Sequence, residues 1–442
     1  MPKKKPFNRL RKMTRQVYDR AAERVRRFTR QTDEVLSEEP IDFSAPSIPY
    51  YENLANRLSF TRVVLYMVLL VFVVVTVICN HRLITYENLY YLAKDISAAT
   101  VTAQSQADQI SYPISSSHAD FALHRGGMVI AGSEVVTAVS GSGRQTLSVN
   151  VAYAEPCVRA SDKYCLTFGR GERSFAVYNS FVQIYRESTE FPVYDAVVGD
   201  NGCFAIVTRS RDYTSEVIIY NDSMEKLANY HLNGYVTGIS MNREGNRLGI
   251  VSVESVNGLW ETKVTLIRMD HRISQSSAVL SGIFGSTCGF VDDERFAVVC
   301  SDRLIIWGTD ATVKGETFFD EATPILCTIS EGRIAILSKM NEAISEKVLQ
   351  VFDKNGLSVY AIQMDASHPV QIAGNAVEMV FGGNTLYIRT VDKLFRLSDN
   401  GKNLYAAVIS RDTLTVLATE DEALICTPAY AARLSHDDFT KE

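Results

Sequence analysis

The sequence predicts an all-β body, a β-propeller of eight four-stranded blades with seven as the alternative, preceded by one transmembrane helix and a basic cytoplasmic tail. Three features carry this prediction: a repeat of about 40–45 residues, an 18-residue stretch without charge, and an uneven distribution of charge and glycine. The chain has 442 residues, of which 46% are apolar and 22% charged. That composition excludes a mainly disordered or fibrous protein.

Charge and glycine divide the chain into two parts. Residues 1–62 carry 14 Lys and Arg against 8 Asp and Glu, and residues 81–442 carry a net charge of −12. All 25 glycines lie at or after Gly126. A basic part without glycine therefore precedes an acidic body rich in turn residues.

The uncharged stretch from Val63 to Asn80 reads VVLYMVLLVFVVVTVICN. As a helix it would span roughly 27 Å, close to the hydrocarbon thickness of a bilayer, and it shows no polar stripe. Because 62 residues precede it, we expect an uncleaved transmembrane helix over residues 59–80. Residues 1–30 hold 12 Lys and Arg, so the positive-inside rule places the N-terminus in the cytoplasm and the body outside, in a single-pass cell-membrane protein.

Residues 1–32 predict an amphipathic cytoplasmic helix. Its basic side chains are candidate contacts with anionic membrane lipid or a partner, the alternative being a solvated topology signal: Lys12, Arg20, Arg24, Arg27 and Arg30. No nucleic acid partner is expected, because basic charge alone is non-specific. Residues 33–58 predict a linker, and residues 81–108 a short juxtamembrane helix with a second linker.

Beyond the membrane segment, short β-branched and aromatic runs alternate with turn residues. Eight markers, each near the end of such a run, follow one another at steps of 37 to 47 residues: Val139, Tyr178, Tyr220, Ile267, Trp307, Phe352, Leu397 and Leu434. A second apolar run precedes each marker where it could be traced, and this period with about four strands per unit is typical of a β-propeller. The propeller is predicted over residues 109–436, with a tail at 437–442 and without the WD dipeptide of WD40 repeats.

The last repeat ends near Leu434 and lacks room for a fourth strand. We therefore expect Ile110–Ile114, which precede the first repeat, to supply that strand. Such a closure removes the exposed edges that an open ring would leave.

Several stretches carry a resemblance to a known family. They are Glu87–Leu92 (ENLYYL), Tyr112–Ile114 (YPI), Pro156–Asn179 (PCVRASDKYCLTFGRGERSFAVYN) and Val193–Asn221. Over residues 55–436 the chain resembles the membrane-anchored propeller proteins of Clostridia-type Gram-positive bacteria, a family of unknown function. The resemblance implies a single-pass anchor and an external propeller, and it carries no catalytic residues.

Motifs of enzymes and metal sites are absent from the sequence. No HxxxH, HExxH, GxSxG, Walker A or GxGxxG pattern occurs, so we predict no cofactor, no metal and no catalytic activity. Asp292-Asp293-Glu294 falls where a hairpin turn is due and lacks the order of an EF-hand, and Asp200-Asn201-Gly202 and Asp399-Asn400-Gly401 are also turn sequences. The glycines around Arg170 and Arg173 indicate an exposed turn rather than an anion site.

The cysteines allow two interpretations. Cys157 with Cys165, and Cys288 with Cys300, fall on adjacent strands and are candidate disulfides. The favoured alternative is that they are small buried apolar side chains in the blades. Three aromatic residues are interpreted as blade packing rather than a ligand cage: Tyr178, Tyr220 and Trp307.

These patterns together predict a non-enzymatic scaffold or sensor at the bacterial cell envelope. A rigid ring presents loops at both ends, and envelope proteins are the expected partners. Two alternatives stay open: an envelope propeller that binds or cleaves glycans, and a receptor for a small ligand. The first requires carboxylates in the central funnel, and the second an aromatic and polar pocket there.

Overall fold

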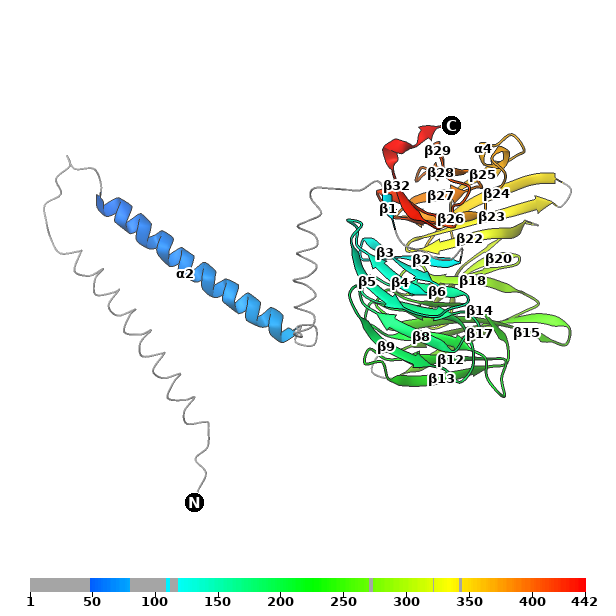
Figure 1. Ribbon diagram of the computed structural model, residues 1–442, viewed down its shortest axis with the longest axis horizontal. Coiled ribbons are helices and arrows are strands. Elements are labelled where there is room, and N and C mark those ends of the chain that lie inside the picture. Colours follow the sequence, from blue (N-terminus) through cyan, green and yellow to red (C-terminus); the bar gives the residue numbers. More distant parts are fainter. Residues whose placement is uncertain (1–47, 80–108, 112–117, 270–272, 321, 342–343) are drawn as a thin grey trace, which may run out of the picture. The chain divides into compact units, whose positions relative to one another are not determined.

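The computed structural model describes residues 48–79, 109–111, 118–269, 273–320, 322–341 and 344–442 (Figure 1). The chain divides into two units, residues 1–89 and 90–442, each described here by itself. The predicted amphipathic helix, most of the first linker and the predicted juxtamembrane helix lie outside the described residues.

One helix, α2, occupies the described part of the first unit and runs from Ile48 to Cys79. It begins inside the segment predicted as a linker, so the boundary at residue 58 is wrong. Its side chains are described for residues 58–72 and 74–75, and the large apolar ones there are 41% to 68% exposed. No helix within the described residues is both long enough and apolar enough to cross a membrane.

The described part of the second unit contains eight sheets, six of which are formed by four strands that follow one another in the chain, while the other two also include β1 or β33. Blade 1 consists of β2 (Ala119–His124), β3 (Gly127–Gly132), β4 (Val135–Val139) and β5 (Gln145–Asn150). Blade 2 consists of β6 (Pro156–Ala160), β7 (Cys165–Gly169), β8 (Ser174–Tyr178) and β9 (Gln183–Ser188). Blade 3 consists of β10 (Val193–Val198), β11 (Phe204–Thr208), β12 (Ser215–Tyr220) and β13 (Lys226–Leu232). Blade 4 consists of β14 (Tyr235–Met241), β15 (Arg247–Val256), β16 (Leu259–Arg268) and β17 (Ser274–Ser281).

The remaining blades repeat this order. Blade 5 consists of β18 (Gly285–Phe290), β19 (Arg295–Cys300), β20 (Arg303–Gly308) and β21 (Val313–Phe318). Blade 6 consists of β22 (Thr323–Ser330), β23 (Arg333–Asn341), β24 (Ile344–Asp353) and β25 (Ser358–Met364). The short helix α4 (Pro369–Ile372) precedes blade 7. Blade 7 contains β26 (Glu378–Gly382), β27 (Thr385–Arg389), β28 (Lys393–Leu397) and β29 (Leu404–Val408). Blade 8 contains β30 (Thr415–Ala418), β31 (Glu422–Cys426) and β32 (Tyr430–Ser435).

The sequence repeat corresponds directly to the blades. All eight marker residues lie on the third strand of a blade, and each pairs with a residue at the start of the second strand. Tyr220 faces Phe204, for example, and Phe352 faces Ile334. The prediction of eight four-stranded blades is therefore confirmed, and the seven-bladed alternative is wrong.

The ring closes through the strand that precedes the first blade. β1 (Gln109–Ser111) pairs with β32 as the fourth strand of blade 8, and Ile110 lies opposite Ala431. Ile110 is 3% exposed and packs with Phe121 and Met128 of blade 1. The predicted closing strand is confirmed over 109–111, and residues 112–114 lie outside the described residues.

The C-terminus extends the fold, contrary to the predicted tail at 437–442. After a 3-10 turn η2 (His436–Asp438), β33 (Thr440–Lys441) pairs with β29 and makes blade 7 five-stranded. Phe439 is 7% exposed and packs beside Tyr387. This segment covers the edge that β29 would otherwise expose.

Hydrophobic packing links the blades in a closed cycle. Eight clusters of buried side chains occur, one between each pair of neighbouring blades. Successive side chains of a strand point to opposite faces, so Ile334 and Ile336 pack toward blade 5 while Ala335 and Leu337 pack toward blade 7. Each blade is buried on both faces, which explains the continuous apolar runs in the sequence.

Candidate functional site

The two ends of the ring are the candidate functional surfaces, and chain direction distinguishes them. In a four-stranded meander, the turn between the second and third strands lies at the same end as the connection to the next blade. We call this the hairpin end, and we call the end with the other turns the turn end. Figure 1 shows the long hairpins β15–β16 and β23–β24 on the same side of the ring as α4.

Exposed apolar side chains gather at the hairpin end. The β15–β16 hairpin turns at Asn257 and Gly258, and beside this turn Leu259 is 63% exposed and Trp260 is 54% exposed. Tyr235, at the start of β14 in the same blade, is 73% exposed. Further exposed apolar residues at this end are Tyr194, Tyr213, Val256, Ile325, Met340, Ile372, Val377, Val391 and Val408. The turn end also exposes apolar side chains, such as Leu357 and Val313, but the exposed aromatic side chains of the blades lie at the hairpin end. Exposed aromatic side chains are typical of interaction sites.

Trp260 is held in place although it is exposed. Its ring lies edge-on to Phe284, with centroids 5.5 Å apart, and its backbone carbonyl accepts a hydrogen bond from Gly282 at 2.7 Å. It pairs with Ser255 across the hairpin. An aromatic side chain fixed in this way can contact a partner at little cost in side-chain entropy.

The turn end carries a polar network centred on Arg243, in the β14–β15 turn. Its guanidinium lies 2.6 Å from Asp162, 3.6 Å from Asp200 and 3.5 Å from Glu331. These carboxylates belong to blades 2, 3 and 6, and blades 2 and 6 are opposite one another in a ring of eight. Arg243 therefore lies near the axis, and its ion pairs cross the central opening at this end.

Charged side chains on the first strands of several blades form ion pairs, either with one another or with the second strand. Arg159 of β6 lies 3.4 Å from Asp120 of β2 and 2.9 Å from Asp195 of β10, so it links three blades. Glu378 of β26 is 2.7 Å from Arg389 and accepts a hydrogen bond from Thr415 of blade 8. These groups stabilise the ring. Within the described ranges, no cluster of three His, Cys, Asp or Glu could hold a metal.

The acidic motifs from the sequence are turns, as predicted. Asp292 Oδ1 accepts hydrogen bonds from the backbone amides of Glu294 and Arg295, at 2.9 and 2.7 Å. Asp200-Asn201-Gly202 and Asp399-Asn400-Gly401 also lie in turns between strands.

The β7–β8 turn differs in one respect from its prediction. Gly169 is buried as the last residue of β7, and only Gly171, at φ 76°, lies in the exposed turn. Arg170 forms an ion pair with Glu155 at 3.5 Å.

The candidate disulfides are absent, and strand register gives the reason. All seven cysteines from Cys157 onward are free thiols. Cys157 faces Phe168, three residues from Cys165, which places the two thiols on opposite faces and about 10 Å apart along the strands. Cys288 faces Val298, two residues from Cys300, also too far for a disulfide. Burial raises the pKa of the Cys165 thiol to about 12, as expected for an unreactive packing residue.

Two further groups of residues were singled out from the sequence, three aromatic residues and the basic residues of the tail. Tyr178, Tyr220 and Trp307 are at most 3% exposed and pack between blades, as predicted. The basic tail residues lie outside the described residues: Lys12, Arg20, Arg24, Arg27 and Arg30.

Sequence reasoning missed the exposed side chains of the hairpin end. A signal was available, because Asn257-Gly258 is a strong hairpin dipeptide and Val256, Leu259 and Trp260 adjoin it. Apolar residues beside such a turn have few neighbours to bury them.

A closed ring of eight four-stranded blades defines the chain as a β-propeller protein. The chain belongs to DUF5711, a family of unknown function, whose profile matches residues 100–427. No curated protein matches the chain.

Solved structures give weaker likenesses. AztD from Citrobacter koseri, in its apo form, is 12% identical with a TM-score of 0.46, covering 64% of this chain and 83% of that one. BamB from Moraxella catarrhalis is 10% identical with a TM-score of 0.47, covering 74% and 99%. Hsv2p from Kluyveromyces lactis is 10% identical with a TM-score of 0.41, covering 65% and 91%. Identities and TM-scores this low carry no information about function.

Proposed function

We propose that this protein is a non-enzymatic scaffold or sensor of the bacterial cell envelope, anchored by one membrane helix with its N-terminus in the cytoplasm. The propeller lies outside the cytoplasm and binds an envelope protein through its hairpin end. The observation that carries the proposal is the set of exposed aromatic side chains at that end, which includes Tyr235 and Trp260 beside the exposed Leu259.

Chain connectivity supports this choice of end. β32 runs from the hairpin end to the turn end, and β1 pairs with it in the antiparallel direction, with Gln109 opposite Ala432 and Ser111 opposite Tyr430. The chain therefore enters the ring from the turn end. The end at which the chain enters is therefore not the end proposed to bind the partner.

The proposed anchor rests on the sequence pattern, since no helix among the described residues meets the requirements for a membrane span. The uncharged stretch from Val63 continues the helix that begins at Ile48, and its described apolar side chains are exposed. An uncharged stretch of 18 residues is close to the length that the hydrocarbon core of a bilayer accepts. The basic residues before it fix the orientation by the positive-inside rule.

Site-specific photocrosslinking in intact cells tests the proposal. A photoreactive amino acid replaces Trp260 at the hairpin end or, as matched control, Leu357 at the turn end, which is 66% exposed. We expect a discrete adduct with an envelope protein from position 260 and none from position 357. In the chain with a photoreactive residue at Tyr235, Leu259→Ser should reduce the adduct about tenfold or more, because central apolar contacts dominate interfaces.

Adducts from both positions in equal yield, or from position 357 alone, would contradict the hairpin end as the binding surface. A reporter fused to the C-terminus tests the topology separately. Activity of that reporter inside the cytoplasm, or release of the chain from membranes by alkaline carbonate, would contradict the anchored arrangement.

A further inference from the structure

The hairpin of blade 5 ends short of the hairpins on either side of it. Counted from the marker pair of each blade, the second strand of blade 5 continues from Phe296 to Cys300, whereas that of blade 4 continues from Leu248 to Val256 and that of blade 6 from Ile334 to Asn341. At about 3.3 Å per residue, the two neighbours extend roughly 10–13 Å beyond blade 5 at the hairpin end. Figure 1 shows both long hairpins projecting on one side of the ring, with β20 between them. We call the space between these hairpins, above the blade 5 turn at Ser301 and Asp302, the notch.

The blade 4 wall of the notch carries two exposed aromatic side chains. Val251 of β15 packs against blade 5. Tyr235 lies opposite Val253 and Trp260 lies opposite Ser255, two and four residues further along β15. Because every second side chain of a strand points to the same face, both aromatic rings also point toward the blade 5 side. Both are more than half exposed, and neither the hydroxyl nor the indole N–H has a protein partner among the described residues.

The facing wall on blade 6 is apolar as well. Ile336 of β23 packs against blade 5, and the same alternation directs Met340 toward that side four residues further on. Met340 is 40% exposed, since blade 5 ends before it. Lys339 and Lys347 lie opposite one another on this hairpin but face blade 7, where Lys347 Nζ donates to the Asn375 side chain at 2.6 Å. The described cations of this hairpin therefore point away from the notch.

The blade 5 turn and two connections between blades form the floor of the notch. The backbone amide of Ser301 donates to the Phe284 carbonyl at 2.8 Å, and that of Phe319 donates to the Asp302 carbonyl at 2.9 Å. These bonds fix the connections on either side of blade 5 beside its β19–β20 turn. The ring of Phe284 also supports Trp260. The floor and one wall are thus in place before a partner binds.

The floor and rim carry an excess of negative charge. Arg303 lies 2.7 Å from Asp302 and 2.8 Å from Glu316, so one cation serves two carboxylates. Asp320, in the connection to blade 6, and Glu346, on the β23–β24 hairpin, are exposed and form no ion pair with a described residue. Four carboxylates and one guanidinium give these five residues a net charge of −3.

Width and backbone pairing indicate which kind of segment fits the notch. Sheets that pack face to face lie about 10 Å apart, so blades 4 and 6 are roughly 20 Å apart across blade 5. A helix with its side chains is about 10–12 Å thick and fills the layer that blade 5 leaves open. The walls present side chains, because β15 pairs with β16 and β23 with β24 along the hairpins. A helix bonds its own backbone, whereas an extended segment between these walls would leave backbone groups unpaired.

We propose that the notch receives an amphipathic helix of the envelope protein, with an apolar stripe flanked by Lys or Arg. This inference rests on the proposed function and names the chemistry of its partner. The stripe contacts Tyr235 and Trp260 on one wall and Met340 on the other, and it covers apolar surface that the free protein exposes. The basic side chains of the helix pair with Asp320 and Glu346, which complements the negative charge of the rim.

Photocrosslinking from both walls in intact cells tests the notch. In separate full-length chains a photoreactive amino acid replaces Trp260 or Met340, and Val391 of blade 7, 48% exposed at the same end, is the positional control. Mass spectrometry then maps the crosslinked residues of the partner. We expect positions 260 and 340 to label one segment of that partner, on residues three, four or seven apart, and position 391 not to label it.

Two matched double variants test the role of charge. Asp320→Asn with Glu346→Gln removes two carboxylates at the notch, and asparagine tolerates the φ of 42° at position 320. This variant should lower the adduct yield from position 260 about threefold or more. Glu254→Gln with Glu261→Gln removes the same charge from the β15–β16 hairpin, but these residues lie opposite one another and face blade 3, so the yield should not change.

A synthetic peptide of the mapped segment tests the helical form. The peptide should compete for the adduct in isolated membranes, and the same peptide with a proline at its centre should not, because proline breaks a helix.

The proposal is overturned if position 340 gives no adduct, if the two double variants have equal effects, or if the labelled residues alternate at every second position, as in an extended strand. These outcomes leave an envelope protein bound at position 260 and so leave the proposed function intact. An adduct with a glycan or with a second copy of this chain would overturn the proposal and contradict the proposed function as well. The two failures are therefore distinguishable by the identity of the species bound at position 260.

Discussion

The two ends of the ring are built by the same blades, yet they use side chains in different ways. At the turn end, polar side chains connect one blade to another: Asn201 donates to the Gly245 carbonyl at 3.1 Å, and Arg247 donates to the Asp293 carbonyl at 2.8 Å. At the hairpin end, large apolar side chains such as Leu259 extend into solvent. The turn end stabilises the ring, and the hairpin end offers surface for recognition.

Strand length explains much of this difference. β15 and β16 are ten residues long, and they meet at the hairpin end, whereas β11 has five residues. The additional residues extend past the neighbouring blades, so their side chains lose the neighbours that would bury them. A frame that is fixed at one end can vary at the other with little loss of stability.

The largest expected difference between the two ends is the cost of replacing a glycine that has a positive φ. A Cβ at Gly245 (φ 73°), at the turn end, would lie 2.0 Å from Asn201 Oδ1, whereas a Cβ at Gly258 (φ 84°), at the hairpin end, would meet nothing within 4 Å. Gly245→Ala should cost about 2–3 kcal/mol, from backbone strain and the displaced Asn201 hydrogen bonds. Gly258→Ala should cost about 1 kcal/mol, from strain alone.

Denaturant unfolding of both variants, with circular dichroism as the signal, measures these values. The comparison relies on equal strain at the two sites, which the similar φ values support. A loss at Gly258 equal to that at Gly245 would show that the hairpin end is packed as tightly as the turn end.

Ion pairs give a second and smaller contrast. Arg243 joins three carboxylates near the axis, whereas Arg411 at the hairpin end has one partner, Asp392, at 3.5 Å. Arg243→Met should lower the free energy of unfolding by about 1 kcal/mol, and Arg411→Met by less than about 0.3 kcal/mol, since isolated exposed pairs contribute little. The first loss should nearly vanish in 1 M NaCl because salt screens exposed charges. A loss that persists in high salt would indicate packing by the Arg243 stem instead.

The blades were predictable because their signal is local. The second and third strands of each blade are apolar on both faces and joined by a short turn, so residues such as Phe204 and Tyr220 recur as pairs within a few dozen positions. The closing strand followed from counting, since seven units had four strands and the last had three. Boundaries were less predictable: α2 begins at Ile48, inside the expected linker.

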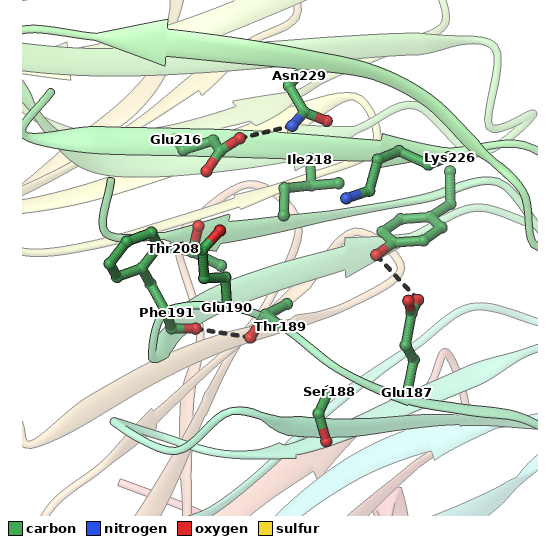
Figure 2. A pocket seen from close by; sticks show the side chains of 11 residues that line it. Glu187, Ser188, Thr189, Glu190, Phe191, Thr208, Glu216, Ile218, Lys226 and Asn229 are labelled. Atoms are coloured by element: carbon green, nitrogen blue, oxygen red, sulfur yellow. Dashed lines mark hydrogen bonds between the residues drawn. The ribbon is translucent and has the colours of Figure 1, made fainter. Parts of the chain in front are cut away.

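Contacts between blades could not be predicted in this way. Arg243 and Glu331 are far apart in the chain and meet only because the ring places their turns around one axis. The rim cavity between blades 2 and 3 (Figure 2) likewise takes its walls from both blades, with Glu187 on β9 and Glu216 on β12. Composition does not encode such contacts, and the cysteine pairs illustrate the same limit, because adjacent strands were identified correctly while the register that separates Cys157 from Cys165 was not.

The smallest expected effect concerns pH at the hairpin end. His368 begins α4, and its Nδ1 accepts a hydrogen bond from the Val370 amide at 3.3 Å. Burial lowers the pKa of His368 below its ordinary value of 6.5, although Asp365 opposes this. The folded state thus favours the neutral ring, so its stabilisation is present above pH 6.5 and is lost as the pH falls through the lowered pKa. Protonation should remove the Val370 hydrogen bond and loosen α4 without unfolding the ring.

An NMR titration tests this prediction. It should show His368 ionising below pH 6.5, together with shifts of the α4 amides. Those shifts should be absent in His368→Asn, where an untitratable side chain caps the helix. Ionisation of His368 at or above pH 6.5 would contradict this account, and parallel shifts at the turn end would show that the two ends are coupled.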